Sequence, residues 1–438
     1  MVKTVDWSKY FSMDLKKIEK LQTIFGVKKI YAMGLMPVRG PKGFRKLDYQ
    51  FAQNGLNVNE VMDKLGECHI NVFGLVIKDT DGACTWDTNI GWNPTDRDIL
   101  GEFCDAGKDR NITLMVSFTS MNDAYQGYLH PERVSIHGKS GKKHGIEYKK
   151  GEISTHNEGE MRVDLPDGIS FEEYQKKIPF LTNKIDEKIG ASRGNRGQGY
   201  IPLTSFMCPN SKHIDYLLEL TKEIVRNYPI KAFFADYIRY NGAFIDLCAC
   251  DHCVKLFHEK FGEKAKIINS KEWFDFKTNA IAEYAQKLQD TIKSINQDCI
   301  TGWFCLPGPK KILSRKRLGQ DWKKLSTILD VVSPMEYPYL MGTRDDGWFW
   351  GKVGDIFYWY FIRNIKKRAH EFGNTPVLSI TNSVECNTEE MLKQMKGFDF
   401  GLGIALFKYY GTSESQWKAI KKYAEEELGL KKDNVIEK

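Results

Sequence analysis

The chain has 438 residues, of which 42% are hydrophobic and 28% charged, and its formal net charge is +7 at pH 7. This composition excludes a disordered or fibrous protein and suits one large α/β domain or two to three ordinary ones. The N-terminal stretch has no apolar signal region and no apolar run reaches the 18 residues of a membrane span, so we expect a cytoplasmic protein.

Short apolar runs alternate with amphipathic stretches along the chain. The runs are apolar throughout, which is typical of parallel strands covered on both faces. Strands are expected at 28–35, 70–77, 112–118, 231–236, 299–306, 330–337, 376–381 and 398–407. Helices are expected at 57–69, 99–111, 211–228, 254–262, 272–295, 321–329, 348–373, 388–396 and 414–429. Asp98 is the expected N-cap of the helix at 99–111.

Residues 120–207 form a long irregular stretch, rich in Gly, His, Lys and Asn, with a helical pattern only at 170–178. No ordinary connection is this long, so we predict an insertion after the third strand. Within it, 138–152 is the most basic segment of the chain. A solvated loop explains this segment better than an arm that binds nucleic acid.

Eight strand–helix units in a chain of this size predict an α/β fold, a (β/α)8 TIM barrel that spans residues 1–438 as a single domain. The insertion would join the third strand to the third helix, and 241–297 would form an extended region after the fourth strand. The alternative is an open doubly wound sheet. It requires a Gly-rich first turn, and 34–43 lacks the G-x-G-x-x-G order.

Barrel enzymes carry their active sites at the C-terminal ends of the strands, so the residues just past each run are the candidates. Asp236 ends the fourth strand and Glu336 ends the sixth. Two carboxylates are the minimum for glycoside hydrolysis, because one protonates the leaving oxygen while the other attacks the anomeric carbon or activates water. We predict this pair as catalytic, with Glu385 after the seventh strand as a competing second carboxylate. The structural alternatives are an Asp236–Arg239 salt bridge and a backbone-bonded rim position for Glu336.

The strand ends also carry further acids, amides and aromatic rings, the side chains that bind sugars. Carboxylates and amides hydrogen-bond to hydroxyl groups, and flat aromatic faces stack on a pyranose. The candidate substrate-binding residues are Asp79, Arg239, Trp303, Tyr337, Asn382, Glu385 and Lys408.

Three of the ten cysteines cluster as Cys248, Cys250 and Cys253 in C-x-C-x-x-C order. Three thiolates at this spacing can bind one soft cation, and tetrahedral zinc needs a fourth ligand. Cys208 is the best candidate, because it lies just before the helix that leads into the fourth strand, and two nearby histidines are alternatives. A site with four cysteine ligands is closed to water, so we predict a structural zinc. A reactive thiol pair and an iron–sulfur cluster are the other interpretations.

The order of these features resembles barrel proteins of the glycoside-hydrolase superfamily over roughly 200–410. A cysteine precedes a helix, the fourth strand ends in "FADYIRY", and "CACDHC" is followed by an F-x-x-x-F-G helix. Family 42 β-galactosidases hold a structural zinc with four such cysteines, which implies Cys208, Cys248, Cys250 and Cys253 as ligands here. The Asn-Glu pair that these enzymes carry on strand four is absent.

A second resemblance fits better. Hypothetical glycosyl hydrolases share an F-D-Y-I-R-Y phrase and an S-P-M-x-Y-P sixth strand, which here is "SPMEYP" at 333–338. An Asp on strand four with an acid on strand six is also similar to α-galactosidase-type barrels. That layout implies Asp236 as nucleophile and Glu336 as general acid/base.

The sequence therefore predicts a cytoplasmic glycosidase that cleaves an oligosaccharide or glycoconjugate, with no nucleic-acid or membrane partner. An oligomer is compatible with it. Two other functions remain open: a barrel that binds carbohydrate without cleaving it, and a hydrolase in which the zinc is catalytic.

Overall fold

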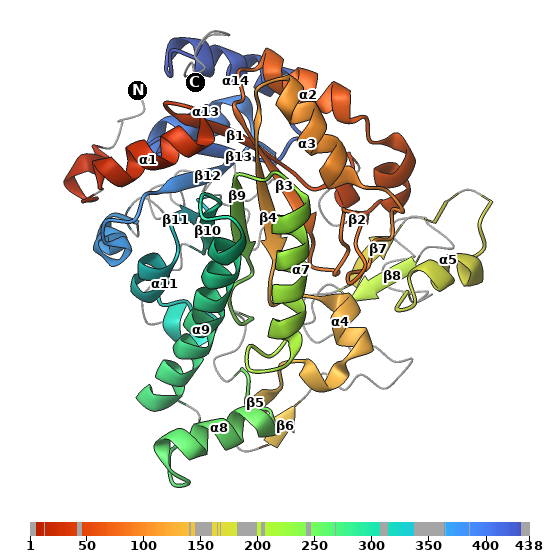
Figure 1. The fold of residues 1–438 in the computed structure, drawn as a ribbon, viewed down its shortest axis with the longest axis vertical. Coiled ribbons are helices and arrows are strands. Elements are labelled where there is room, and N and C mark those ends of the chain that lie inside the picture. Colours follow the sequence, from red (N-terminus) through yellow and green to blue (C-terminus); the bar gives the residue numbers. More distant parts are fainter. Residues whose placement is uncertain are drawn as a thin grey trace.

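The computed structural model describes most of the chain. The described residues are 6–41 except 13, 46–139, 142–144, 160–163, 165–166, 168–181, 199–202, 206–241, 247–306 except 268, 314–336, and 363–430 except 364 and 385. Within them, eight parallel strands form a barrel that helices surround (Figure 1).

The barrel strands follow one another in chain order. They are β1 (Ile30–Leu35), β3 (Val72–Lys78), β4 (Thr113–Thr119), β9 (Ala232–Asp236), β10 (Ile300–Cys305), β11 (Val331–Pro334), β12 (Leu378–Asn382) and β13 (Gly403–Phe407). Each pairs in parallel with its neighbour, and β13 pairs with β1. Parallel bridges Val332–Val377 and Met335–Ile380 join β11 to β12 and complete the ring. The predicted (β/α)8 barrel is confirmed.

Helices follow most of the strands and cover the outside of the barrel. The longer ones are α1 (Leu15–Phe25), α2 (Val58–Glu67), α3 (Ile99–Asp109), α7 (His213–Asn227), α8 (Asp251–Phe261), α9 (Lys271–Ile295), α11 (Trp322–Ile328), α13 (Thr388–Phe398) and α14 (Glu414–Glu426). Asp98 caps α3 as predicted, because its side chain accepts a hydrogen bond from the Gly101 N–H. No described helix has the length and apolar character to cross a bilayer.

The core has two layers, one inside the barrel and one between the strands and the helices. Interior residues come from alternate strand positions, for example Phe234 and Phe304. α1 contributes to this inner layer, since Ile18, Leu21 and Phe25 pack with the first residues of the strands. α1 therefore closes the N-terminal end of the barrel and leaves the C-terminal end as the mouth.

Residues 120–212 separate β4 from α7 and contain several short elements. These are α4 (Ala124–Leu129), the hairpin of β5 (His137–Lys139) with β6 (Lys142–His144), β7 (Glu160–Val163), α5 (Phe171–Lys177) and β8 (Gly199–Pro202). β7 pairs with β8 and with β2 (Lys46–Leu47) from the connection after β1. The excursion is thus tied to the β1 side of the mouth by a small sheet.

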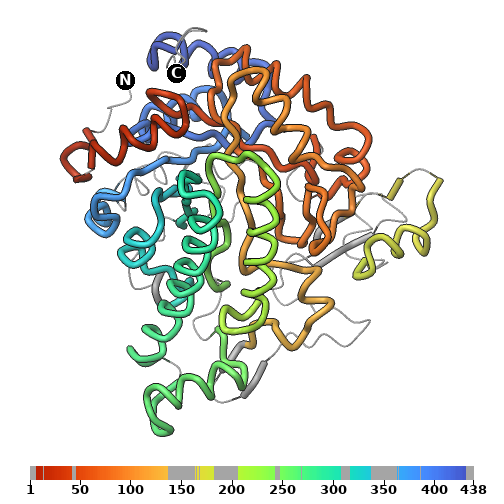
Figure 2. Tube along the Cα trace, in the orientation of Figure 1, coloured from red at the N-terminus to blue at the C-terminus, as the bar shows by residue number. Residues whose placement is uncertain are grey.

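The start of the last strand differs from the prediction. The last strand begins at Gly403 rather than at 398, because Phe398 ends α13 and the chain turns at Gly401 and Gly403 with φ of 69° and 134°. The helix predicted at 348–373 falls largely outside the described residues. Figure 2 shows that the first helix and the last lie on the same side of the molecule, as the pairing of β1 with β13 requires.

Candidate active site and cysteine cluster

Asp236 ends β9 on the interior side of the barrel. The strand alternates, with Ala232 and Phe234 in the inner core, so Asp236 has the same orientation two positions later at the mouth. Its side chain is half-buried, and Oδ1 accepts a hydrogen bond of 2.6 Å from the Tyr237 N–H. Burial raises the pKa of Asp236 to about 6, although the Tyr237 N–H and the Arg239 charge oppose the shift. This carboxyl can therefore give or take a proton near neutral pH.

Arg239 lies next to Asp236 on a bed of two aromatic rings. Tyr237 has a left-handed backbone, with φ of 47°, and the Arg239 guanidinium carbon lies 4.4 Å from its ring centroid and 5.6 Å from that of Phe206. Nη1 donates to the Tyr240 carbonyl at 3.2 Å. Among the described residues no carboxylate lies within 4.0 Å of this guanidinium, so the direct salt bridge with Asp236 is not formed there.

Asp79 follows β3 and forms an ion pair with Arg39. Arg39 donates from Nε and Nη2 to the two carboxylate oxygens at 2.7 and 3.0 Å, and the Thr80 N–H donates to Oδ1 at 2.6 Å. Burial alone would raise the pKa of Asp79, but the Arg39 guanidinium overrides it and holds the pKa below its ordinary value. Asp79 is only 2% exposed, so in this arrangement it orders the mouth rather than meeting a sugar.

Asp81 lies two residues further on. Burial and the Asp79 charge raise its pKa to about 6, and the Tyr49 hydroxyl donates a hydrogen bond to it. Its carboxylate also accepts from the Ala83 N–H at 3.1 Å, so Asp81 shapes the turn after β3.

Glu336 points the other way from Asp236. Met335 belongs to the inner core, so Glu336, one residue later, faces the helices, beside Ser379 and Cys305. It is 1% exposed, and neither carboxylate oxygen has a hydrogen-bond partner among the described residues. Burial raises the pKa of Glu336 well above its ordinary value, with the Ser379 hydroxyl opposing the shift. The predicted catalytic pair is therefore not brought together at the mouth.

Three other predicted substrate contacts are also buried. Trp303 is fully buried in the outer layer, since it alternates with the interior Phe304, and its ring faces the helices. Asn382 ends β12 on the interior side with 4% exposure, and its Oδ1 accepts from the Val384 N–H at 3.0 Å. Lys408 follows β13 and is 3% exposed.

Two predicted site residues, Tyr337 and Glu385, lie outside the described residues. Of the predicted set, Asp236 and Arg239 are the ones that the structure places together, half-exposed, at the mouth.

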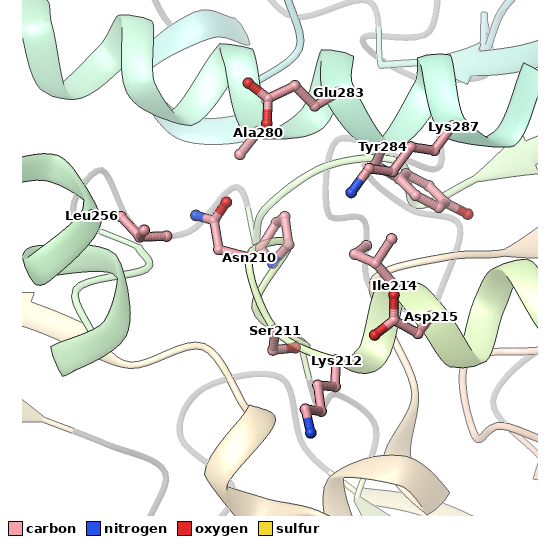
Figure 3. Close-up of a pocket in the computed structure, with 11 residues that line it drawn as sticks. Asn210, Ser211, Lys212, Ile214, Asp215, Leu256, Ala280, Glu283, Tyr284 and Lys287 are labelled. Atoms are coloured by element: carbon pink, nitrogen blue, oxygen red, sulfur yellow. The ribbon is translucent and has the colours of Figure 1, made fainter. Parts of the chain in front are cut away.

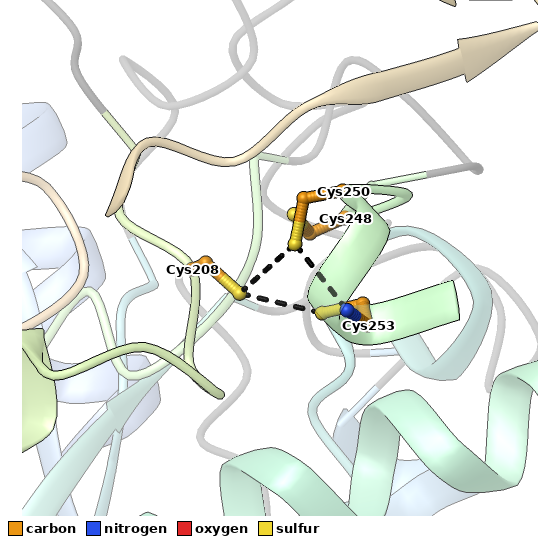
Figure 4. Close-up of side chains that lie close together, drawn as sticks. All are labelled: Cys208, Cys248, Cys250 and Cys253. Carbon is orange, nitrogen blue, oxygen red and sulfur yellow. Dashed lines mark hydrogen bonds between the residues drawn. The ribbon is translucent and has the colours of Figure 1, made fainter. Parts of the chain in front are cut away.

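The four cysteines form one compact cluster (Figure 4). Their sulfur atoms all lie within 4.8 Å of one another, with Cys208 Sγ 3.3 Å from Cys253 Sγ and 3.9 Å from Cys250 Sγ. A tetrahedral zinc with bonds of about 2.3 Å has sulfur–sulfur edges of roughly 3.8 Å. The sequence prediction of Cys208 as fourth member agrees with this geometry, and the four residues can hold a metal ion.

Three of the cysteine sulfur atoms accept hydrogen bonds from N–H groups around the cluster. The Ile136 N–H donates to Cys248 Sγ at 3.1 Å, Asn210 Nδ2 to Cys253 Sγ at 3.3 Å, and the Cys253 N–H to Cys250 Sγ at 3.4 Å. Such donors stabilise negative charge on sulfur and orient metal ligands. All four cysteines are buried, so a metal ion bound by all four would have no position open to water.

The cluster connects to the mouth through a short segment. Phe206, which contacts Arg239, lies two residues before Cys208. The Met207 N–H between them donates to the Met121 carbonyl at 2.7 Å, and the Met121 N–H donates to the Tyr237 carbonyl at 3.1 Å. The segment that bears Cys208 therefore also supports the tip of β9.

A separate hollow of about 260 Å³ lies in the helix layer between α7, α8 and α9 (Figure 3). Lys212, Asp215, Glu283 and Lys287 supply its charged lining, and Asn210 joins it to the cysteine cluster. It contains none of the predicted substrate-binding residues.

Two residues that contact Arg239, Phe206 and Tyr237, are not signalled by the sequence. Phe206 lies in an irregular stretch, and only its spacing from Cys208 ties it to the site. The left-handed backbone of Tyr237 turns its ring under Arg239. No period or spacing in the sequence signals such a turn.

No protein-family model matches this sequence, and no curated protein matches it. Solved structures do share its fold. The glycoside hydrolase domain of PgaB (BpsB) from Bordetella bronchiseptica is 11% identical, with 94% of this chain and 99% of that chain covered and a TM-score of 0.56.

Two longer enzymes are also similar. α-L-Fucosidase isoenzyme 2 from Paenibacillus thiaminolyticus is 14% identical, with 91% of this chain and 49% of that chain covered and a TM-score of 0.54. The β-galactosidase from Bacillus circulans sp. alkalophilus is 13% identical, with 93% and 57% covered and a TM-score of 0.54. This chain thus spans about half the length of these enzymes, and at such identities the likeness establishes the barrel fold.

Proposed function

We propose that the chain is a glycoside hydrolase in which Asp236 is a catalytic carboxyl. The observation that carries this proposal is a half-exposed acid at the end of the fourth barrel strand with a pKa near 6, next to a guanidinium on an aromatic bed. Active sites of (β/α)8 enzymes lie at this end of the barrel. The structural neighbours bear the names of a fucosidase, a β-galactosidase and a glycoside hydrolase domain, which favours an oligosaccharide or glycoconjugate as substrate.

Glycoside hydrolysis then requires a second carboxylate besides Asp236. Glu336 does not suit the role, because its side chain faces the helix layer and is 1% exposed. We therefore assign the role to Glu385, the acid that follows the seventh strand in the sequence. Asp236 would act as nucleophile or as acid/base, and the two roles give different kinetics.

We propose zinc for the cysteine cluster, held by Cys208, Cys248, Cys250 and Cys253 as a structural ion. Bound there, zinc would cross-link the segment before α7 to the start of α8. A hydrolase with a catalytic zinc is the weaker alternative, because four buried thiols leave no position for water. All ten cysteines are unpaired, which suits a cytoplasmic location. We also propose 1–438 as one domain, with 120–207 as its insertion and 241–297 as its zinc-bound region.

The test is hydrolysis of a panel of aryl glycosides by wild type, Asp236→Asn, Asp236→Gly and Glu385→Gln. We expect Asp236→Asn to lose at least about 10³-fold in kcat/KM. If Asp236 is the nucleophile, azide restores turnover of Asp236→Gly. If it is the acid, substrates with an activated 2,4-dinitrophenyl leaving group are spared. Full activity of Asp236→Asn would end the assignment, and sugar binding without turnover by wild type would favour a carbohydrate-binding barrel.

A further inference from the structure

We propose that Arg239 is a receptor for a carboxylate on the substrate, so that the sugar recognised at the mouth is acidic, such as a uronic acid unit. This inference rests on the proposed function, since it concerns the same site. It begins from a guanidinium without an ion-pair contact: at the mouth, the carboxylate of Asp79 contacts Arg39, whereas no described carboxylate lies within 4.0 Å of Arg239, although Asp236 is near enough for the two charges to interact.

The geometry leaves the edge of the Arg239 guanidinium for a ligand. The guanidinium carbon lies 4.4 Å from the Tyr237 ring centroid and 5.6 Å from that of Phe206, and the N–H groups of a guanidinium make their hydrogen bonds in its own plane. Of its five N–H groups, one is used by the Tyr240 carbonyl. Nε is buried and has no acceptor among the described residues. The residue as a whole is half-buried, so part of its side chain is open to solvent.

The planar fork of an arginine matches the two oxygens of a carboxylate. A neutral hexose offers hydroxyl groups instead, which compensate a guanidinium less well. An aromatic bed restricts the side chain to one plane before binding, so less rotamer freedom is lost when the ligand arrives. The site therefore favours a planar anion over a neutral sugar.

Asp236 is compatible with an acidic ligand because its carboxyl group can take up a proton and lose its negative charge. Burial already raises its pKa to about 6, and a second negative charge nearby would raise that pKa further. A protonated Asp236 does not repel a carboxylate and can serve as a proton donor. Acidic substrates are thus expected to move the upper limb of the pH–rate profile to higher pH than neutral substrates do.

The experiment measures binding of matched glycan pairs, each uronic-acid oligosaccharide beside its carboxyl-reduced neutral form, with Asp236→Asn to prevent turnover. In this background Arg239→Gln and Arg239→Lys are compared with Lys212→Gln, which also removes one positive charge but at an exposed position beside the hollow between α7, α8 and α9. We expect acidic members to bind roughly 10- to 100-fold more tightly than neutral ones. Arg239→Gln should abolish this preference, Arg239→Lys should retain part of it, and Lys212→Gln should leave it intact.

Equal binding of the two members of every pair overturns the proposal, as does a preference that survives Arg239→Gln or no binding of any acidic glycan. A stronger preference for sulfated glycans than for carboxylated ones also overturns it. Thermal melting of each variant identifies loss of fold, and Arg239→Lys supplies a second readout if Arg239→Gln unfolds. If wild type hydrolyses neutral glycosides and shows no preference for acidic glycans, this inference is wrong but the proposed glycosidase activity is supported. If wild type binds acidic glycans through Arg239 but never cleaves them, the inference about Arg239 stands and the proposed hydrolase activity is wrong.

Discussion

Asp236 ends β9 and Glu336 lies two residues beyond β11, and burial raises the pKa of both, yet their surroundings differ. Asp236 is half-exposed at the mouth, with the Tyr237 N–H and Arg239 beside it. Glu336 is 1% exposed between strands and helices, with no hydrogen-bond partner among the described residues. The first environment suits the proton exchange proposed for Asp236. The second environment only penalises the ionised form.

The two acids face opposite sides of the barrel wall because their positions along the strands differ by one residue relative to the interior side chains. Asp236 lies two positions after the interior Phe234, whereas Glu336 lies one position after the interior Met335. Side chains of a strand alternate between its two faces, so an acid one residue further along would face the mouth. An acid at a strand end is therefore a candidate for catalysis only if its side chain lies on the interior face of the strand.

The largest expected effect is on hydrolysis. Asp236→Asn should lose at least about 10³-fold in kcat/KM, whereas Glu336→Gln should stay within roughly threefold of wild type, because its side chain does not reach the mouth. Both are measured on whichever aryl glycoside the wild type cleaves. A comparable loss in Glu336→Gln would break the contrast and return Glu336 to the catalytic pair.

Removal of the cysteine cluster comes next. Cys208→Ser should lose one bound zinc per chain, measured by elemental analysis, and about 3–5 kcal/mol of unfolding free energy. Cys104→Ser, outside the cluster and half-buried, is the matched control and should change stability by less than about 1 kcal/mol. Amide exchange should accelerate at 236–239, next to the cluster, and not at 331–336. Uniform acceleration at both strand ends would show that the cluster has no local effect on the mouth.

The two acids should also differ in how they affect stability with pH. A raised pKa means that the folded state keeps its proton while the unfolded chain ionises, so each acid lowers stability as pH rises above its unfolded pKa of about 4, by up to about 1.4 kcal/mol per pH unit. For Asp236 this loss ends near pH 6. Partial exposure limits the gain of Asp236→Asn to about 1–2 kcal/mol at pH 7.

Glu336→Gln should gain more, about 2–3 kcal/mol at pH 7, because Glu336 is fully buried. Neither variant should differ much from wild type at pH 4, where the unfolded chain also holds the protons. Urea unfolding at pH 4, 5.5 and 7 measures both. A larger gain in Asp236→Asn than in Glu336→Gln would reverse the assigned environments.

The smallest effect concerns Ser379. Its hydroxyl lies beside Glu336 without a well-formed hydrogen bond and opposes the rise in the Glu336 pKa, so Ser379→Ala should lower stability at pH 7 by at most about 0.5 kcal/mol in wild type. In the Glu336→Gln background the same change should cost less, which a double-mutant cycle measures. Equal costs in both backgrounds would separate Ser379 from Glu336.

Much of the fold could be predicted, because eight apolar runs and the intervening amphipathic helices are strong periodic signals. The position of Asp236 followed from its place after "KAFFA", and Cys208 from its place before the helix into the fourth strand. The orientation of Glu336 and Trp303 could not be predicted, because a run that is apolar at every position hides which face is which. The Arg39–Asp79 pair joins residues 40 apart in sequence, and no local pattern announces it.

The pairing of β1 with β13 has a consequence for how the molecule is made. The partner of Ile30 is Gly403, so the seam of the barrel needs both ends of the chain. A ribosome that adds about 5–20 residues per second leaves β1 waiting on the order of tens of seconds for that partner. During this interval one edge strand, with its row of unpaired peptide groups, is a template for other chains. The growing chain is therefore expected to need protection by chaperones at this edge until its last strand is synthesised.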